Sequence, residues 1–242
     1  MSDEKQSPSR RTLLKSLVFV PMGVGAAGAL HHGLQSADAA GTAAPEGKPD
    51  PYTPTFFNPN EWRFLTAAVD RLIPHDEHGP GGIEVGVLEF MDRHMQTPYA
   101  AGSIWYLQGP FFEATEDFGY QGKLPLKDII RVGIKDFDAH AGQAFGGKAF
   151  ADLEHKQQED LLKAAETGKL NFPNINAKIF FANLLTEVRN GYFCDPKHGG
   201  NKNMAAWKMI GFPGMRADYL EWVTVRDKPY PLPPVDLAGR RV

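Results

Sequence analysis

The sequence predicts a mainly α-helical fold: an irregular single-domain helical bundle with long Gly/Pro-rich loops. Apolar residues recur at helical spacing in several segments, and no convincing run alternates with a period of two. The 242 residues include 25 glycines and 19 prolines, which interrupt the helical segments and fix unusual backbone geometry in the connections. We find no internal repeat, so an irregular bundle is favoured over a symmetric one.

The first helix is expected to begin just after Asn58. Asn58 is a typical N-cap, Pro59 suits the first turn, and Glu61 stands three residues after the cap, where it completes a capping box. Pro74 should end the helix. Between these signals one helical face collects the apolar residues Trp62, Leu65, Val69, Leu72 and Ile73.

Five further helices follow from the same periodicity. The expected ranges are Ile83 to about Met95, about Ile104 to Phe118, Leu126 to about Phe145, Phe150 to Glu166, and a last helix that Asn174 caps. The residues expected to face the core are Val87, Leu88 and Met91, then Ile129, Ile130, Ile134, Phe137 and Ala141, then Leu161 and Leu162, and finally Ile175, Ile179, Phe180, Leu184, Leu185 and Val188.

The N-terminus has the order of parts of an export signal. Arg10-Arg11 precedes an uncharged stretch from Ser16 to Leu30, and Ala37-Asp38-Ala39 is a plausible cleavage motif. The arginine pair predicts a twin-arginine signal, a route that moves proteins already folded. An uncleaved anchor is the alternative, although the stretch is short and glycine-rich for a spanning helix.

The expected organisation therefore has four parts. Residues 1–39 are the signal peptide, 40–55 a flexible linker, 56–225 the helical domain and 226–242 a Pro-rich C-terminal tail. The net charge of −3 disfavours nucleic acid as a partner. The sequence carries no motif for an iron–sulfur cluster, covalent haem or a dinucleotide, although proteins sent by this route often carry a cofactor.

Three groups of residues could carry chemistry. The loop from His75 to His78 offers metal-ligand types, but a solvated turn in which Asp76 and Glu77 cap amides or pair with Arg71 is the simpler interpretation. Asp136 and His140 are expected to form a surface ion pair rather than part of a di-iron centre. The single cysteine, Cys194, is expected to be buried or to pair with another chain. A catalytic pair with His198 is disfavoured, because Pro196 breaks their helical relation.

Two aromatic doublets stand out, Phe111-Phe112 and Phe180-Phe181. Adjacent residues on a helix diverge by about 100°, so each doublet is expected to aim one ring away from its own core. Such rings are suited to anchoring another element or another chain.

Short stretches in two loops, residues 70–82 and 190–214, and in the chain between them resemble a known family. The stretches are Asp70-Arg71-Leu72-Ile73-Pro74, Gly79-Pro80-Gly81, Gly86-Val87, Phe90-Met91-Asp92, Gly109-Pro110, Phe150 with Leu153, Asn190-Gly191-Tyr192-Phe193 with Asp195-Pro196, Gly199-Gly200-Asn201, Trp207-Lys208 and Gly211-Phe212-Pro213-Gly214. Together they resemble the small subunit (subunit 3) of membrane-bound gluconate 2-dehydrogenase, also found with exported sorbitol, fructose and glucose dehydrogenases.

The resemblance implies a non-catalytic subunit. In that family a large subunit binds FAD and oxidises the sugar or sugar acid, and a cytochrome subunit with haem c passes the electrons to the membrane quinone. The small subunit carries the signal, engages the twin-arginine translocase and assists the flavoprotein's maturation. This implies a periplasmic protein held at the inner membrane through its complex, with no cofactor, metal or catalytic residue of its own.

The motif loops supply the candidate residues for contact with the flavoprotein. They are Arg71, Pro74, Tyr192, Phe193, Cys194, Asp195, Gly200, Asn201, Trp207 and Phe212. Two alternatives remain open at this stage: a free-standing metal-binding enzyme that uses the His75–His78 loop, and a free-standing periplasmic binding or structural protein.

Overall fold

The computed structural model describes residues 52–112 and 115–241, which fall within one unit of the chain, Asp50–Val242. In this part every regular element is helical, and pairing between extended segments is limited to isolated bridges. The mainly α-helical fold class is therefore confirmed. Among the described residues, no helix has both the length and the apolar character that crossing a bilayer requires. Residues Arg10, Arg11 and Ala39 of the expected signal lie outside the described range.

Helix α2 (Pro59–Leu72) matches the expectation at both ends. The Asn58 side chain accepts hydrogen bonds from the N–H groups of Asn60 and Glu61, and Glu61 Oε2 accepts from the Asn58 N–H at 2.9 Å. This reciprocal capping box satisfies backbone donors that have no partner within the helix. Leu65 and Val69 are buried on the apolar face.

Helix α3 (Val87–His94) begins four residues later than expected. Gly86 has φ +82°, which ends the preceding turns and starts the helix, so the segment from Ile83 is not yet helical. Val87, Leu88 and Met91 are buried, as the periodicity predicted.

The expected helix from Ile104 to Phe118 is wrong. Its described residues, 104–112 and 115–118, form turns and irregular chain, with one 3₁₀ turn at Glu116–Phe118. Pro110 has no N–H to donate and restricts Gly109 to extended backbone, so a continuous helix cannot pass this point. Its apolar side chains also lack a core to face, because Phe111 and Phe112 are both exposed.

Helix α4 (Leu126–Ala144) is confirmed, and it buries Ile130, Ile134 and Phe137 in the core. The expected surface ion pair of Asp136 and His140 is wrong, because Asp136 is buried. Its two carboxylate oxygens accept hydrogen bonds from Asn174, from the backbone N–H at 2.9 Å and from the side-chain amide at 2.7 Å. Asp136 thus fixes the loop before the last long helix, and Asn174 serves this contact instead of capping the helix.

The expected helix from Phe150 is divided in two. A 3₁₀ turn at Phe150–Asp152 is followed by α5 (His155–Glu166), because Leu153 and Glu154 are extended. Glu154 caps α5 through a capping box with Gln157. The break places the buried ring of Phe150 against Phe64 and Phe137, at centroid distances of 4.8 and 5.0 Å.

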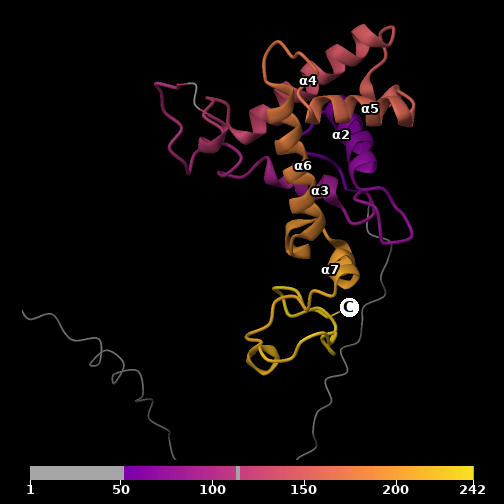
Figure 1. Cartoon of the computed structure of the whole chain (residues 1–242), viewed down its shortest axis with the longest axis vertical. Coiled ribbons are helices and arrows are strands. Elements are labelled where there is room, and N and C mark those ends of the chain that lie inside the picture. Colours follow the sequence, from indigo (N-terminus) through magenta and orange to yellow (C-terminus); the bar gives the residue numbers. More distant parts are fainter. Residues whose placement is uncertain (1–51, 113–114, 242) are drawn as a thin grey trace, which may run out of the picture. The chain divides into compact units, whose positions relative to one another are not determined.

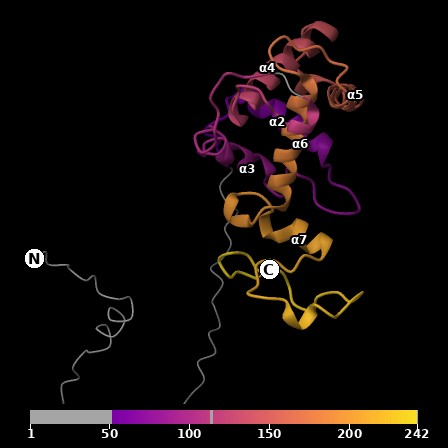
Figure 2. The ribbon, with the colours of Figure 1, turned by 60° about the vertical axis from the view of Figure 1, so that its left-hand side comes forward.

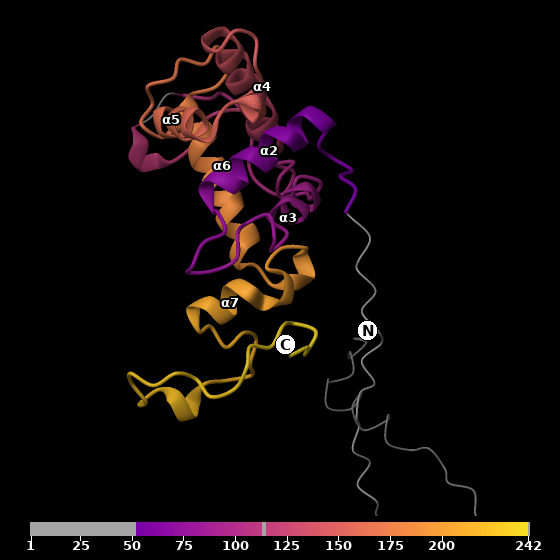
Figure 3. The same ribbon diagram turned by 90° about the vertical axis from the view of Figure 1, so that its right-hand side faces the viewer.

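Helix α6 (Ala177–Phe193) is the central element, with Asn176 as its N-cap. Figures 1 to 3 show it running through the middle of this unit, and it contacts α2, α3, α4 and α5. Because neighbours surround it, both Phe180 and Phe181 are buried, and the expectation that one ring points away from the core is wrong.

The chain upstream of α2 is fastened to α3 by Asp92. The buried carboxylate accepts hydrogen bonds from the N–H groups of Thr55, Phe56 and Phe57 and from the hydroxyls of Tyr52 and Thr55, at 2.8 to 3.0 Å. Burial would raise the pKa of Asp92, but these donors lower it by more, so the group stays ionised.

Short helix α7 (Ala205–Ile210) leads into the C-terminal segment, drawn in yellow in Figure 1. Val235 returns to Gly214, where Met215 N–H donates to Val235 O at 2.7 Å. Residues 215–234 therefore form a loop whose two ends meet.

Candidate functional site

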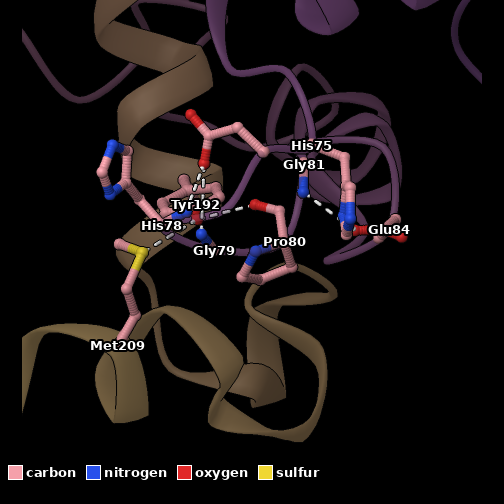
Figure 4. A network of polar contacts seen from close by, with 9 residues as sticks. His75, His78, Gly79, Pro80, Gly81, Glu84, Tyr192 and Met209 are labelled. Atoms are coloured by element: carbon pink, nitrogen blue, oxygen red, sulfur yellow. Dashed lines mark hydrogen bonds and ion pairs between the residues drawn. The ribbon is translucent and has the colours of Figure 1, made fainter.

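The two motif loops predicted from the sequence lie against each other. The first connects α2 to α3, and the second follows α6. Figure 4 shows Tyr192, at the end of α6, reaching the first loop, where its hydroxyl donates to Pro80 O at 2.8 Å. Lys202 N–H donates to Val85 O at 3.0 Å. The motifs of both loops thus form one structural site.

The environment of Tyr192 favours the protonated phenol, which can donate a hydrogen bond. Burial raises its pKa, and the nearby carboxylates of Asp76 and Glu84 raise it further. Met209 Sδ on α7 lies 3.7 Å from the same hydroxyl (Figure 4). Tyr192 therefore links α6, the first loop and α7 in one contact.

Glycines in the motifs allow the two backbones to approach closely. A Cβ added at Gly86 would meet Gly199 O at 2.7 Å, and one added at Gly200 would lie 2.0 Å from Gly191 O. A side chain at Gly86 would separate the two loops, and one at Gly200 would push the second loop away from the end of α6. Gly199 has φ +97°, a backbone conformation that favours glycine.

The polar residues of the second loop are used inside the chain. Asn201, at φ +44°, donates from its amide to Cys194 O and accepts from the Ala206 N–H, both at 2.9 Å. Trp207 donates its indole N–H to Phe193 O at 2.8 Å. These bonds close the loop on itself and fix the start of α7.

Asp195 connects this loop to the C-terminal segment. One carboxylate oxygen accepts from the Lys197 N–H and caps a 3₁₀ turn, and the other accepts from the Leu237 N–H at 2.8 Å. The expected tail, residues 226–242, is therefore attached to the motif loops at this point.

The ten candidate contact residues differ in exposure. Tyr192, Asp195, Gly200, Asn201 and Trp207 are buried, Arg71 and Cys194 are half-buried, and Pro74, Phe193 and Phe212 are exposed. The buried members hold the loops in place, and only the exposed members present their side chains to solvent. Arg71 forms ion pairs with Asp70 and Glu159, which orient it along the α2 surface.

The loop from His75 to His78 forms a solvated turn. Asp76 caps the N–H groups of His78 and Gly79, while His75 Nδ1 lies 2.8 Å from Glu84 Oε2 (Figure 4). The contact with His75, together with the Gly81 N–H, lowers the pKa of Glu84. Within the described ranges, no group of three or more His, Cys, Asp or Glu residues is arranged to hold a metal ion.

Cys194 is a free cysteine at the end of α6. Burial raises the pKa of its thiol to about 11, so little of the reactive thiolate is present at neutral pH. Its Sγ lies 3.4 Å from Gly191 O. Whether it lies near a partner stays a prediction.

Sequence reasoning missed a short polar contact between α3 and α6. His94 Nδ1 lies 2.6 Å from Glu187 Oε2, and Glu187 is buried. Asn190 donates to the other carboxylate oxygen at 3.2 Å. A glutamate among the apolar residues of a helix face was the available signal, because a buried carboxylate requires partners.

The connection between α3 and α4 exposes many large apolar side chains to solvent: Tyr99, Ile104, Trp105, Tyr106, Phe111, Phe112, Phe118 and Tyr120. Phe111, Phe112 and Tyr120 line one recess with residues of α6.

Comparison with known proteins agrees with the motifs. The family model described as gluconate 2-dehydrogenase subunit 3 matches residues 59–214, which run from the start of α2 to the base of the C-terminal loop. No curated protein and no solved structure matches the chain. The match covers more than half of the sequence, and the chain belongs to the gluconate 2-dehydrogenase subunit 3 family.

Proposed function

We propose that this chain is the non-catalytic small subunit of a membrane-associated, FAD-dependent gluconate or sugar dehydrogenase complex. In this proposal it carries the export signal and assists the folding and transport of the flavoprotein. The family match supports a place in a gluconate dehydrogenase complex. The Arg10-Arg11 pair supports twin-arginine export, which suits a partner that binds its flavin before it crosses the membrane.

One observation carries the proposal beyond the family match. The polar side chains of the motif loops, Tyr192, Asp195 and Asn201, are engaged in bonds that lock the loops together. A catalytic group must instead reach a substrate or a cofactor. Such use of the motif residues favours a rigid platform for another protein.

The division of labour follows from this role. The large subunit holds FAD and chooses the substrate, and a possible third subunit with haem c passes the electrons on. The complex works in the periplasm at the inner membrane. The small chain contributes the export signal and a stable binding surface, so the flavoprotein needs no signal peptide of its own.

Co-expression tests the proposal. The flavoprotein subunit is produced with the wild-type chain, with an Arg10→Lys/Arg11→Lys variant, or alone, and FAD-loaded flavoprotein is measured in the periplasm and cytoplasm. We expect periplasmic FAD-loaded enzyme only with the wild-type chain. Equal export and equal flavin loading in cells that lack the chain would refute the escort role.

A further inference from the structure

The loop of residues 215–234 presents its middle to solvent. Its two ends meet where the Met215 N–H donates to Val235 O at 2.7 Å. Between them a 3₁₀ turn, Leu220–Trp222, leads into Val223, and the Leu220 and Val223 side chains are 77% and 73% exposed. Large apolar side chains that are this open to solvent are available for contact with another molecule or with a membrane.

Aromatic rings next to this turn give it a defined shape. The rings of Trp222 and Tyr219 pack on Tyr230, with centroid distances of 5.0 and 5.8 Å. The Arg216 guanidinium carbon lies over the same ring, 4.9 Å from its centre, and the Tyr219 hydroxyl donates to Gly214 O at 2.6 Å. A loop that is already ordered loses less conformational entropy when it binds.

Segments beside the loop expose further apolar side chains. The Leu237 N–H donates to Asp195 at 2.8 Å, which holds the base of the loop against the chain that follows α6. Figures 1 to 3 show α7 and the loop at one end of the described unit, with α4 and α5 at the other. We call residues 196–241 the C-terminal surface. Its exposed large apolar members outside the turn are Met209, Ile210, Phe212, Met215, Tyr219, Leu232 and Leu237.

The C-terminal surface is basic. Residues 196–241 contain eight Lys or Arg and four Asp or Glu, whereas residues 52–195 carry an excess of acidic residues. Two of the eight cations are engaged in ion pairs, Lys202 with Glu89 and Arg240 with the buried Asp236. The others, which form no ion pair within the described part of the chain, are Lys197, Lys208, Arg216, Arg226, Lys228 and Arg241. They outnumber the three exposed acidic residues of this surface, so a positive charge is available to a partner.

This combination fits the surface of an anionic lipid bilayer. Proteins that lie on a membrane use apolar side chains that enter the interface, Trp and Tyr rings at the level of the headgroups, and Lys or Arg beside the lipid phosphates. The loop supplies all three kinds of side chain. A symmetric contact with a second copy would bring the same cations face to face. The loop also lies beyond residue 214, where the family match ends, so a contact with a protein partner common to the family is not expected to depend on it.

We propose that the C-terminal surface binds an anionic bilayer, with Leu220 and Val223 entering the headgroup region and the surrounding cations contacting lipid phosphates. The small chain then touches the membrane itself. This inference goes beyond the proposed function, which leaves membrane association to the complex as a whole, and its failure would leave the escort role untouched.

Vesicle binding tests the proposal. The full chain is incubated with vesicles of phosphatidylcholine alone, or of phosphatidylcholine and phosphatidylglycerol in equal parts, and the bound protein is separated by flotation. Leu220→Ser/Val223→Ser removes the apolar turn, and Arg226→Gln/Lys228→Gln removes two exposed cations. Circular dichroism and thermal melting check that the variants fold like the wild type.

Two matched controls lie elsewhere in the chain. Ile104 and Phe112, on the α3–α4 connection, are 68% and 73% exposed, and Ile104→Ser/Phe112→Ser is the apolar control. Lys163 and Lys169 are exposed on α5 and just after it, and Lys163→Gln/Lys169→Gln is the charge control. All of these proteins keep the same N-terminal segment, so any contribution of that segment to lipid binding is common to them.

The wild type and both controls should bind the anionic vesicles more tightly than the neutral ones. The Leu220/Val223 variant should bind roughly tenfold more weakly or less. The Arg226/Lys228 variant should lose about 5–30-fold in binding to anionic vesicles only. A wild type that does not bind anionic vesicles, or variants that bind as tightly as the controls, would overturn the proposal.

Fluorescence quenching locates the contact independently. Trp222 is one of four tryptophans in the chain, and lipids brominated in their acyl chains quench only the tryptophans that reach them. We expect brominated anionic vesicles to quench the wild type, and Trp222→Phe to lose most of that quenching. Quenching that Trp222→Phe leaves unchanged would show that another part of the chain meets the lipid, and would contradict the proposal.

Two further measurements address the other occupants. Light scattering gives the mass of the purified chain in solution, and co-purification with the tagged flavoprotein subunit reports on the complex. We expect neither result to change in the Leu220/Val223 variant. A dimer or a flavoprotein complex that this variant abolishes would show that protein covers the C-terminal surface, and the assignment to lipid would be wrong.

Discussion

Replacing Asp92 by asparagine should loosen the segment that joins the N-terminal region to the folded domain. The Asp92 carboxylate accepts five hydrogen bonds from Tyr52, Thr55, Phe56 and Phe57, and three of the donors are backbone N–H groups that need a partner. Asparagine keeps the shape but turns an NH₂ group toward some of these donors. The structure around the site therefore stays the same while part of the bonding is lost.

The expected cost follows from these bonds. A hydrogen bond to a charged group contributes roughly 1.5–3 kcal/mol, and one oxygen of asparagine still accepts, so we expect a loss of about 3 kcal/mol. For a domain of this size that corresponds to a melting temperature lower by about 6–12 °C. Urea unfolding followed by tryptophan fluorescence measures the change. Asp160→Asn, at an exposed pair with Lys156, is the control and should change stability by less than about 0.5 kcal/mol.

The pH dependence has a definite sign. Because the folded-state pKa of Asp92 is lowered, its contribution is complete above the unfolded value near 4 and is lost as the pH falls through the folded value. The difference between wild type and Asp92→Asn should therefore shrink in acid. A variant as stable as the wild type at pH 7, or a difference that grows in acid, would contradict the assigned role.

Three more predictions concern the core, the thiol and a carboxylate. Gly133→Ala should cost about 1–3 kcal/mol or more, because its Cβ would lie 1.9 Å from the Phe180 ring, whereas Gly142→Ala on the same helix has space and should stabilise by about 0.5–1 kcal/mol. Equal urea midpoints for the two variants would refute this packing. Cys194, with a thiol pKa of about 11, should react with a disulfide reagent at pH 8 roughly 100-fold more slowly than in urea, and equal rates would show that it is accessible and ionised. Burial raises the pKa of Asp138, so the contribution of Asp138 to stability should decline as the pH rises above about 4, and the stability of Asp138→Asn relative to the wild type should increase from acid to pH 7. A relative stability that decreases from acid to pH 7 would contradict this sign.

Local signals in the sequence correctly predicted the helices whose ends carry capping residues. Asn58, Pro59 and Glu61 place the start of α2 because a capping box is a local structure, and the periodicity of α4 identifies its buried face. Predicted helix ends were wrong where contacts between residues far apart in the sequence determine the local structure. Asn174 looked like a cap, but Asp136 on α4 binds it and the helix begins after Asn176.

The segment from Ile104 to Phe118 illustrates a different limit. The sequence predicts a continuous helix here, whereas the structure leaves Ile104, Phe111 and Phe112 exposed on an irregular connection. Apolar residues at helical spacing do not by themselves show that a core lies beside them. Gly109-Pro110 was the local signal against a helix.

The sequence singled out the two motif loops, whereas their contact with a partner stays a prediction. The motifs identified two loops, and those loops meet, yet Tyr192, Asn201 and Trp207 bond within the chain. A family motif indicates which residue type is needed at a position. Only the packing shows whether the requirement is internal or belongs to another molecule.

The central claim is that this chain contributes a binding surface and an export signal, and that its partner subunit carries out the redox chemistry. Native mass spectrometry of the purified dehydrogenase complex tests it most directly. We expect this chain in a fixed ratio to the large subunit, with all of the flavin remaining on the large subunit when the complex is dissociated. An isolated chain that retains flavin, haem or metal and oxidises substrate by itself would contradict the claim.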